Sequence, residues 1–79
     1  MRIRKNYGNS NITGKNISKI RREKGIKQKE MLAKLQVLGV DISPSCLSEL
    51  EGQTRIATDK EIWAIAEILN VPVECLFEE

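Results

Sequence analysis

The stretch KQKEMLAKLQVLGVDISPSCLSELEG, residues 27–52, decides the fold because it holds two helix signals separated by one break. In its first half, apolar residues recur at the spacing of one helix face: Met31, Leu32, Leu35 and Leu38. Residues 39–42 interrupt this pattern, and Ser43 followed by Pro44 starts a new helix. Serine is a favourable N-cap, and proline loses no hydrogen bond at the first helical position. The stretch therefore predicts two consecutive helices joined by a short connection.

The sequence on either side of this stretch also has helical patterns. Upstream, a helix is expected from Gly14 to Gly25, a residue suited to the position after a helix end. Downstream, Thr58 and Glu61 have the spacing of a capping box, which opens a long helix. A short fifth helix is expected over residues 73–77. Because no alternating strand pattern occurs, the fold class predicted is all-α with five helices.

The chain of 79 residues is expected to form one small domain, residues 14–79, preceded by an arm. Residues 1–13 are basic and polar without periodicity, which predicts a flexible N-terminal arm. The longest apolar run is too short for a membrane span or a signal peptide, so a cytoplasmic location is expected. Cys46 and Cys75 are expected to be reduced, and without any histidine no metal site is predicted.

The charge of the chain is strongly asymmetric. Residues 1–29 hold ten Lys or Arg and one Glu, whereas residues 30–79 hold three Lys or Arg and ten Asp or Glu. A basic segment of this kind indicates a surface for a polyanion such as nucleic acid, although a solvated basic helix has the same composition.

A series of residues across most of the chain resembles the helix-turn-helix family of phage repressor and Cro type, the XRE-like domains. The matching residues occur in the family's order and spacing: Arg21, Gly25, Gln28, Leu35, Ile42, Ser43, Leu47, Glu49, Leu50, Glu51, Arg55, Thr58, Ile65, Ala66, Leu69, Leu76 and Phe77. The connection before Ser43 is longer than in the shortest members, as in a subfamily with an extended helix 2–helix 3 connection. The resemblance implies that helices 2 and 3 form the motif and that helix 3 enters the major groove.

The resemblance also implies roles for individual residues. The positions that face the bases in helix 3 are Pro44, Ser45, Ser48 and Glu49. The positions that contact the DNA backbone are Lys27, Gln28, Lys29, Ser43, Arg55 and Lys60. Arg21 and Glu51 match a structural ion pair between helices 1 and 3. Because helix 3 carries no Arg, Asn or Gln, we expect backbone contacts to dominate and base readout to be weak.

The function expected is that of a DNA-binding transcriptional regulator, with double-stranded DNA as its partner and a homodimer as its assembly. A small patch of Trp63, Cys75 and Phe77 is the candidate dimer surface, although Trp63 at the core rim of a monomer fits equally well. The alternative is a helix-turn-helix module for protein–protein regulation, whose acidic helix 3 meets a basic partner. No catalytic residues, cofactor or small-molecule ligand are predicted, and the chain is not expected to be an enzyme, because histidine and a paired nucleophile are missing.

Overall fold

The computed structural model describes residues 11–78, and this part of the chain is all-helical without strands. The helices in chain order are α1 (Gly14–Glu23), α2 (Gln28–Val37), α3 (Pro44–Glu51), α4 (Asp59–Leu69) and the short 3-10 helix η1 (Val73–Phe77). The all-α prediction is therefore confirmed. The short fifth helix expected over residues 73–77 is a 3-10 helix, so the described residues hold four α-helices.

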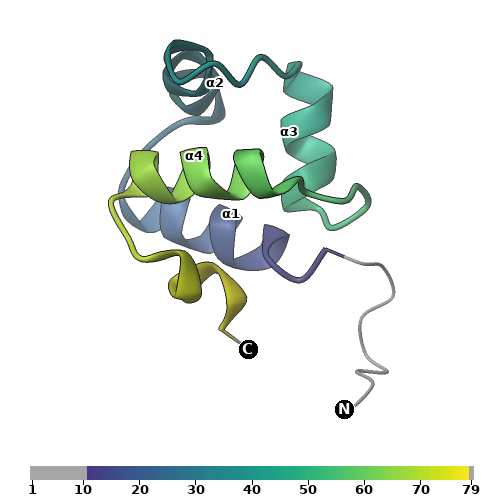
Figure 1. Ribbon diagram of the computed structural model, residues 1–79, viewed down its shortest axis with the longest axis vertical. Coiled ribbons are helices and arrows are strands. Elements are labelled where there is room, and N and C mark those ends of the chain that lie inside the picture. Colours follow the sequence, from purple (N-terminus) through teal and green to yellow (C-terminus); the bar gives the residue numbers. More distant parts are fainter. Residues whose placement is uncertain (1–10, 79) are drawn as a thin grey trace.

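The helices pack around one another with α1 at the centre of the arrangement. In Figure 1, α4 crosses in front of α1, α3 stands at one end of α1, and η1 lies below it. α1 contacts all three of these elements, whereas α2 packs against α3 and α4. Segments far apart in the sequence thus share one core.

The core consists of apolar helix faces together with Val40 from the connection between α2 and α3. Its buried members are Ile17, Met31, Leu35, Val40, Leu47, Leu50, Ala64, Ile65, Ala66, Leu69 and Leu76. Leu32 and Leu38 belong to the predicted face of α2, and Ile62 lies on α4. All three are partly buried and pack against this core. Each fully buried Leu or Ile side chain stabilises the fold by roughly 1.5–3 kcal/mol relative to an exposed one.

Local signals fix where the helices begin and end. The Ser43 hydroxyl accepts a hydrogen bond from the Cys46 N–H at 3.1 Å, so Ser43 is the N-cap of α3. The capping box at the start of α4 is also present, because Thr58 and Glu61 exchange hydrogen bonds. Gly25, with φ of 71°, takes the left-handed conformation that ends α1.

The expected boundary between arm and domain needs correction. Asn11 and Thr13 were expected in a flexible arm, but both are buried and hydrogen-bonded to the helical part. Residues 11–13 therefore belong to the domain, because Asn11 satisfies backbone groups that would otherwise lack partners. The rest of the expected arm, residues 1–10, lies outside the described residues.

Candidate nucleic-acid interface

The outer face of α3 is formed by the four positions expected to face bases. Leu47 and Leu50 are buried and fix the rotation of α3, and the opposite side chains are exposed: Pro44, Ser45, Ser48 and Glu49. The hydroxyls of Ser45 and Ser48 can donate or accept hydrogen bonds, and the Glu49 carboxylate can accept them. This face can therefore meet base edges or phosphates, but it offers no positive charge.

An ion pair holds α3 against α1. The Arg21 Nε lies 2.7 Å from Oε2 of Glu51, and Arg21 Nη2 lies 3.1 Å from Oε1. Arg21 Nη1 also donates to the carbonyl of Ile26 at 2.7 Å. Both side chains are largely buried, and this is the pair implied by the family resemblance. It fixes α3 relative to α1 and to the turn before α2, which is a structural role.

Gln28 joins this ion pair from the first turn of α2. Its Nε2 donates to Oε1 of Glu51 at 3.0 Å, and the residue is half-buried. The expected role of Gln28 was a hydrogen bond to a DNA phosphate. In this structure its amide nitrogen connects α2 to α3, and its backbone N–H lies at the helix start. The phosphate contact of Gln28 stays a prediction.

Arg55, which is expected to contact the DNA backbone, forms an ion pair within the fold. Its guanidinium donates to both carboxylate oxygens of Glu61, at 3.1 and 2.8 Å. The Glu61 side chain is only 7 % exposed, so this bidentate pair anchors the loop before α4 to the start of that helix. The charge of Arg55 is thus matched by a buried carboxylate, and its contact with the DNA backbone stays a prediction.

The ion pair shifts the pKa values of both partners. The hydrogen bond from Arg55 to Glu61 raises the pKa of Arg55 above its ordinary value. Burial by itself would raise the pKa of Glu61, but hydrogen bonds from Arg55 and Thr58 and the Arg55 charge outweigh it. The pKa of Glu61 is therefore lowered, and the carboxylate is ionised at neutral pH.

The remaining expected backbone contacts fall into three separate places. Lys27 and Lys29 are exposed at the start of α2, next to Gln28. Lys60 is also exposed, but its ammonium lies beside Gly39, beyond the other end of α2. Since a ten-residue helix is about 15 Å long, Lys60 is far from the α2 start. Ser43 lies at the N-terminus of α3, with its hydroxyl used as the cap.

Asn11 is a structural residue that sequence reasoning missed. Its Oδ1 accepts hydrogen bonds from Thr13 and from the Gly14 N–H, and its Nδ2 donates to the carbonyls of Leu50 and Arg55. Asn11 thus caps the start of α1 and holds the end of α3. A local signal was present, because an Asn side chain readily accepts a hydrogen bond from the backbone N–H two residues on, as from Thr13 here.

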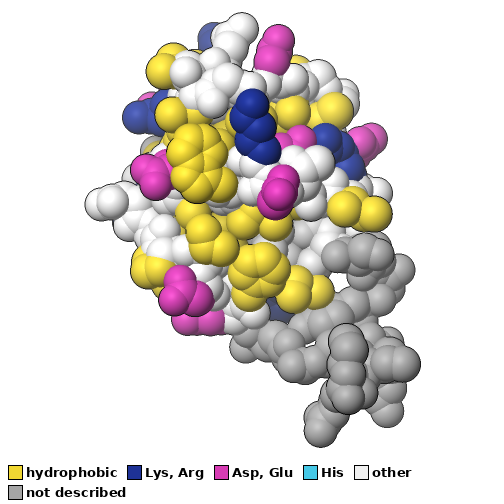
Figure 2. Space-filling view, in the orientation of Figure 1, with side chains coloured by type: hydrophobic (Ala, Val, Ile, Leu, Met, Phe, Trp, Pro, Cys, Tyr) yellow, Lys and Arg dark blue, Asp and Glu magenta, His cyan; other side chains and the backbone are white. Residues whose placement is uncertain are grey.

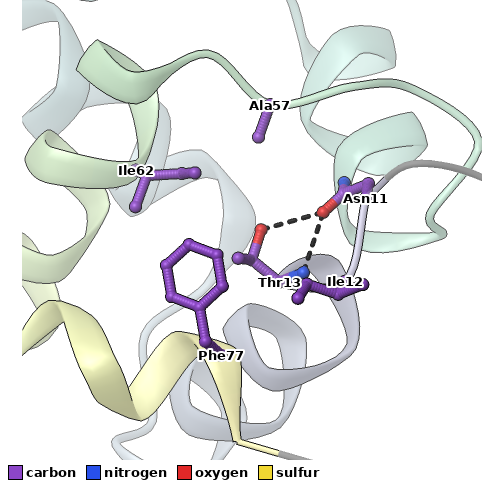
Figure 3. Close-up of a pocket in the computed structure, with 6 residues that line it drawn as sticks. All are labelled: Asn11, Ile12, Thr13, Ala57, Ile62 and Phe77. Atoms are coloured by element: carbon purple, nitrogen blue, oxygen red, sulfur yellow. Dashed lines mark hydrogen bonds between the residues drawn. The ribbon is translucent and has the colours of Figure 1, made fainter. Parts of the chain in front are cut away.

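A shallow hollow of about 180 Å³ adjoins Asn11. Figure 3 shows Ile62 from α4 and Phe77 from η1 beside it, with the Asn11–Thr13 hydrogen bonds at one side. Its lining is small and mostly apolar: Asn11, Ile12, Thr13, Ala57, Ile62 and Phe77. The hollow presents no cluster of charged groups, and within residues 11–78 no group of three or more His, Cys, Asp or Glu is placed to hold a metal ion.

The candidate dimer patch is exposed in part. Trp63 on α4 is 48 % exposed and Phe77 on η1 is 41 % exposed, whereas Cys75 is half-buried with a free thiol. Val73 adds a further exposed apolar side chain on η1. The two elements pack against each other, and Figure 2 shows hydrophobic side chains on the face that carries them.

Comparisons with known proteins identify no relative of this chain. No protein-family model matches the chain, and neither a curated protein nor a solved structure matches it. The helices of the described residues also include none that is long and apolar enough to cross a membrane.

Proposed function

We propose that the protein is a DNA-binding transcriptional regulator, acting in the cytoplasm, in which α2 and α3 form a helix-turn-helix. In this proposal α3 enters the major groove and the start of α2 contacts the DNA backbone. The observation that carries the proposal is the exposed outer face of α3, held at a fixed angle beside the basic start of α2. The Arg21–Glu51 pair and the Gln28–Glu51 hydrogen bond provide that rigidity.

The start of α2 supports the backbone contact in two ways. Lys27 and Lys29 are exposed and attract phosphates, and the first N–H groups of α2 carry a partial positive charge. These contacts position the protein on the duplex without reading its sequence. Sequence readout then comes from Ser45, Ser48 and Glu49, with Glu49 accepting from the amino group of cytosine.

The proposed regulator acts as a homodimer, because one helix of this size covers only a half-site. The surface proposed for the two-fold contact is the exposed apolar side of α4 and η1, with Trp63, Val73 and Phe77. An apolar patch of this kind on a small domain is typical of a protein contact.

The test is selection of bound duplexes from a random pool with the full chain. We expect enrichment of a motif in which a cytosine pairs with the position of Glu49, and we expect Glu49→Gln to relax the preference at that base. Ser48→Glu adds a carboxylate to the outer face of α3 and should weaken binding by about tenfold or more. Gln36→Glu adds the same charge at an exposed position of α2 away from that face and serves as the matched control.

A second function is favoured by one observation. The α3 helix carries no basic residue, Glu49 is exposed on it, and the nearby Arg55 is engaged by Glu61. An acidic surface of this kind fits a basic protein partner. If the random pool yields no motif and Glu49→Gln abolishes a complex with a basic protein, this second function replaces the first.

A further inference from the structure

A row of basic side chains runs along α1 on the side away from the core. Lys15, Lys19 and Arg22 are all exposed and follow one another at intervals of four and three residues. Side chains at these intervals lie on the same side of a helix. The opposite side of α1 carries the buried residues Gly14, Ile17 and Arg21. We call Lys15, Lys19 and Arg22 the α1 basic row.

The positive charge that is free to bind a partner is concentrated here and at the start of α2. Residues 11–78 hold ten Lys or Arg, and ion pairs engage two of them, Arg21 and Arg55. Six of the other eight lie between residues 15 and 29: Lys15, Lys19, Arg22, Lys24, Lys27 and Lys29. Glu23 is the exposed carboxylate on α1 itself, and no ion pair joins it to the row.

The surroundings of α1 leave the row open. α3, α4 and η1 all pack against α1, and Figure 1 shows α4 in front of it and η1 below it. Asn16 points toward η1, where its Nδ2 donates to the carbonyls of Leu76 and Glu78. The face that carries α4 and η1 presents hydrophobic and acidic side chains among isolated Lys and Arg, as Figure 2 shows. The row lies on α1, whereas the candidate dimer patch lies on α4 and η1.

The row is joined to the proposed DNA-binding surface by the turn between α1 and α2. This turn contains Lys24 and Lys27 and is tightened by hydrogen bonds from the Gly25 N–H to the Arg22 carbonyl and from the Ile26 N–H to the Arg21 carbonyl. A phosphate backbone that contacts Lys27 and Lys29 therefore meets further exposed cations when it continues toward α1.

The spacing of the row also fits a DNA strand. From Lys15 to Arg22 the helix rises by about 10 Å. One strand of B-DNA advances about 3.4 Å along the axis for each phosphate, so the row has the length of about three phosphates. Like charges at these intervals repel one another, and a polyanion relieves that repulsion.

We propose that the α1 basic row binds the phosphate backbone of duplex DNA that flanks the segment contacted by α3. This inference rests on the proposed function and extends the contact from one half-site to its flank. The row contributes affinity without sequence preference, since phosphate contacts do not distinguish bases.

The test compares the salt dependence of DNA binding in two variants of the full chain. The row variant carries Lys15→Gln and Lys19→Gln, which remove two positive charges from the α1 basic row. The control variant carries Gln36→Glu and Asn70→Asp, which lower the net charge by the same two units at exposed positions outside the row. The logarithm of the binding constant falls with the logarithm of salt concentration by about 0.9 for each phosphate contacted. We expect the row variant to reduce this slope by about 1.8 and the control variant to leave it unchanged.

Duplex length distinguishes the flank from other contacts. A duplex of about three helical turns should bind wild type more tightly than one of about one turn, and the row variant should lose this difference. Suppose that wild type binds DNA but that the row variant and the control variant show the same salt slope and the same dependence on duplex length. That result would overturn the inference. If wild type binds neither duplex, the proposed function itself fails.

Discussion

Gly14 determines how closely α1 approaches the end of α3. A Cβ atom at this position would overlap the backbone carbonyl oxygen of Leu50. Because backbone atoms cannot move aside as a flexible side chain can, Gly14→Ala must displace one helix against the other. We expect a loss of about 1–3 kcal/mol in the free energy of unfolding. Urea denaturation followed by Trp63 fluorescence measures this loss, and Lys15→Ala on the same helix is the control that should change little. Equal stability of the two variants would contradict the close packing at Gly14.

Asn11 holds α1 and α3 together, a role that the polar composition around it did not indicate. Its side chain satisfies backbone groups of α1, α3 and the loop after α3, although the residue follows a segment of polar sequence. We expect Asn11→Ala to lower the free energy of unfolding by about 2 kcal/mol, because buried N–H and C=O groups lose their partners. Asn11→Asp keeps the acceptor but loses the donor to Leu50 and Arg55, and should also destabilise. A stability within error of wild type for Asn11→Ala would show that these groups find other partners.

The Arg55–Glu61 pair makes stability depend on pH. The pKa of Glu61 is lower in the folded than in the unfolded chain, so the unfolded chain binds the additional proton as the pH falls. The contribution of Glu61 is complete above its ordinary pKa of about 4.3 and is lost as the pH falls through the folded value. We expect the free energy of unfolding of wild type to decrease more between about pH 7 and about pH 3 than that of Glu61→Gln. Parallel pH profiles for the two proteins would exclude this role of Glu61.

The elements show which features a sequence can predict. The starts of α3 and α4 were predicted from Ser43, Pro44, Thr58 and Glu61, because capping is a local interaction between residues three apart. The buried faces followed from helical spacing. The partners of Arg55 and Asn11 could not be predicted in this way. Four acidic residues lie within six positions of Arg55: Glu49, Glu51, Asp59 and Glu61. The Asn11 contacts reach residues 39 and 44 positions away.

Substitutions at Ser43 distinguish the stability of α3 from its contact with DNA. Ser43→Ala removes the cap and should cost about 1 kcal/mol in the free energy of unfolding. Ser43→Asp keeps an N-cap acceptor and should retain stability, but its charge at the start of α3 repels phosphates. Thermal unfolding and DNA binding of both variants test this. If Ser43→Asp binds the duplex as tightly as wild type, the start of α3 does not face DNA.

At the scale of the whole molecule, the apolar side of α4 and η1 predicts self-association. Trp63→Glu places a charge in this patch and should shift a dimer toward monomer without unfolding the domain, because Trp63 is 48 % exposed. Sedimentation at micromolar concentration with circular dichroism of the same samples measures both effects. Wild type that remains monomeric with and without DNA would show that this surface does not form a dimer contact.

The charge distribution of the whole molecule is the basis of the central claim. Six exposed cations lie between residues 15 and 29, on α1, the turn after it and the start of α2. The acidic residues outside ion pairs lie mostly beyond residue 40. The claim that this surface and α3 bind duplex DNA is tested most directly by titrating the full chain with a duplex over a range of salt concentrations. We predict binding at low salt that weakens linearly on logarithmic axes, because each neutralised phosphate releases counterions. Absence of binding at low salt, or an affinity independent of salt, would contradict it.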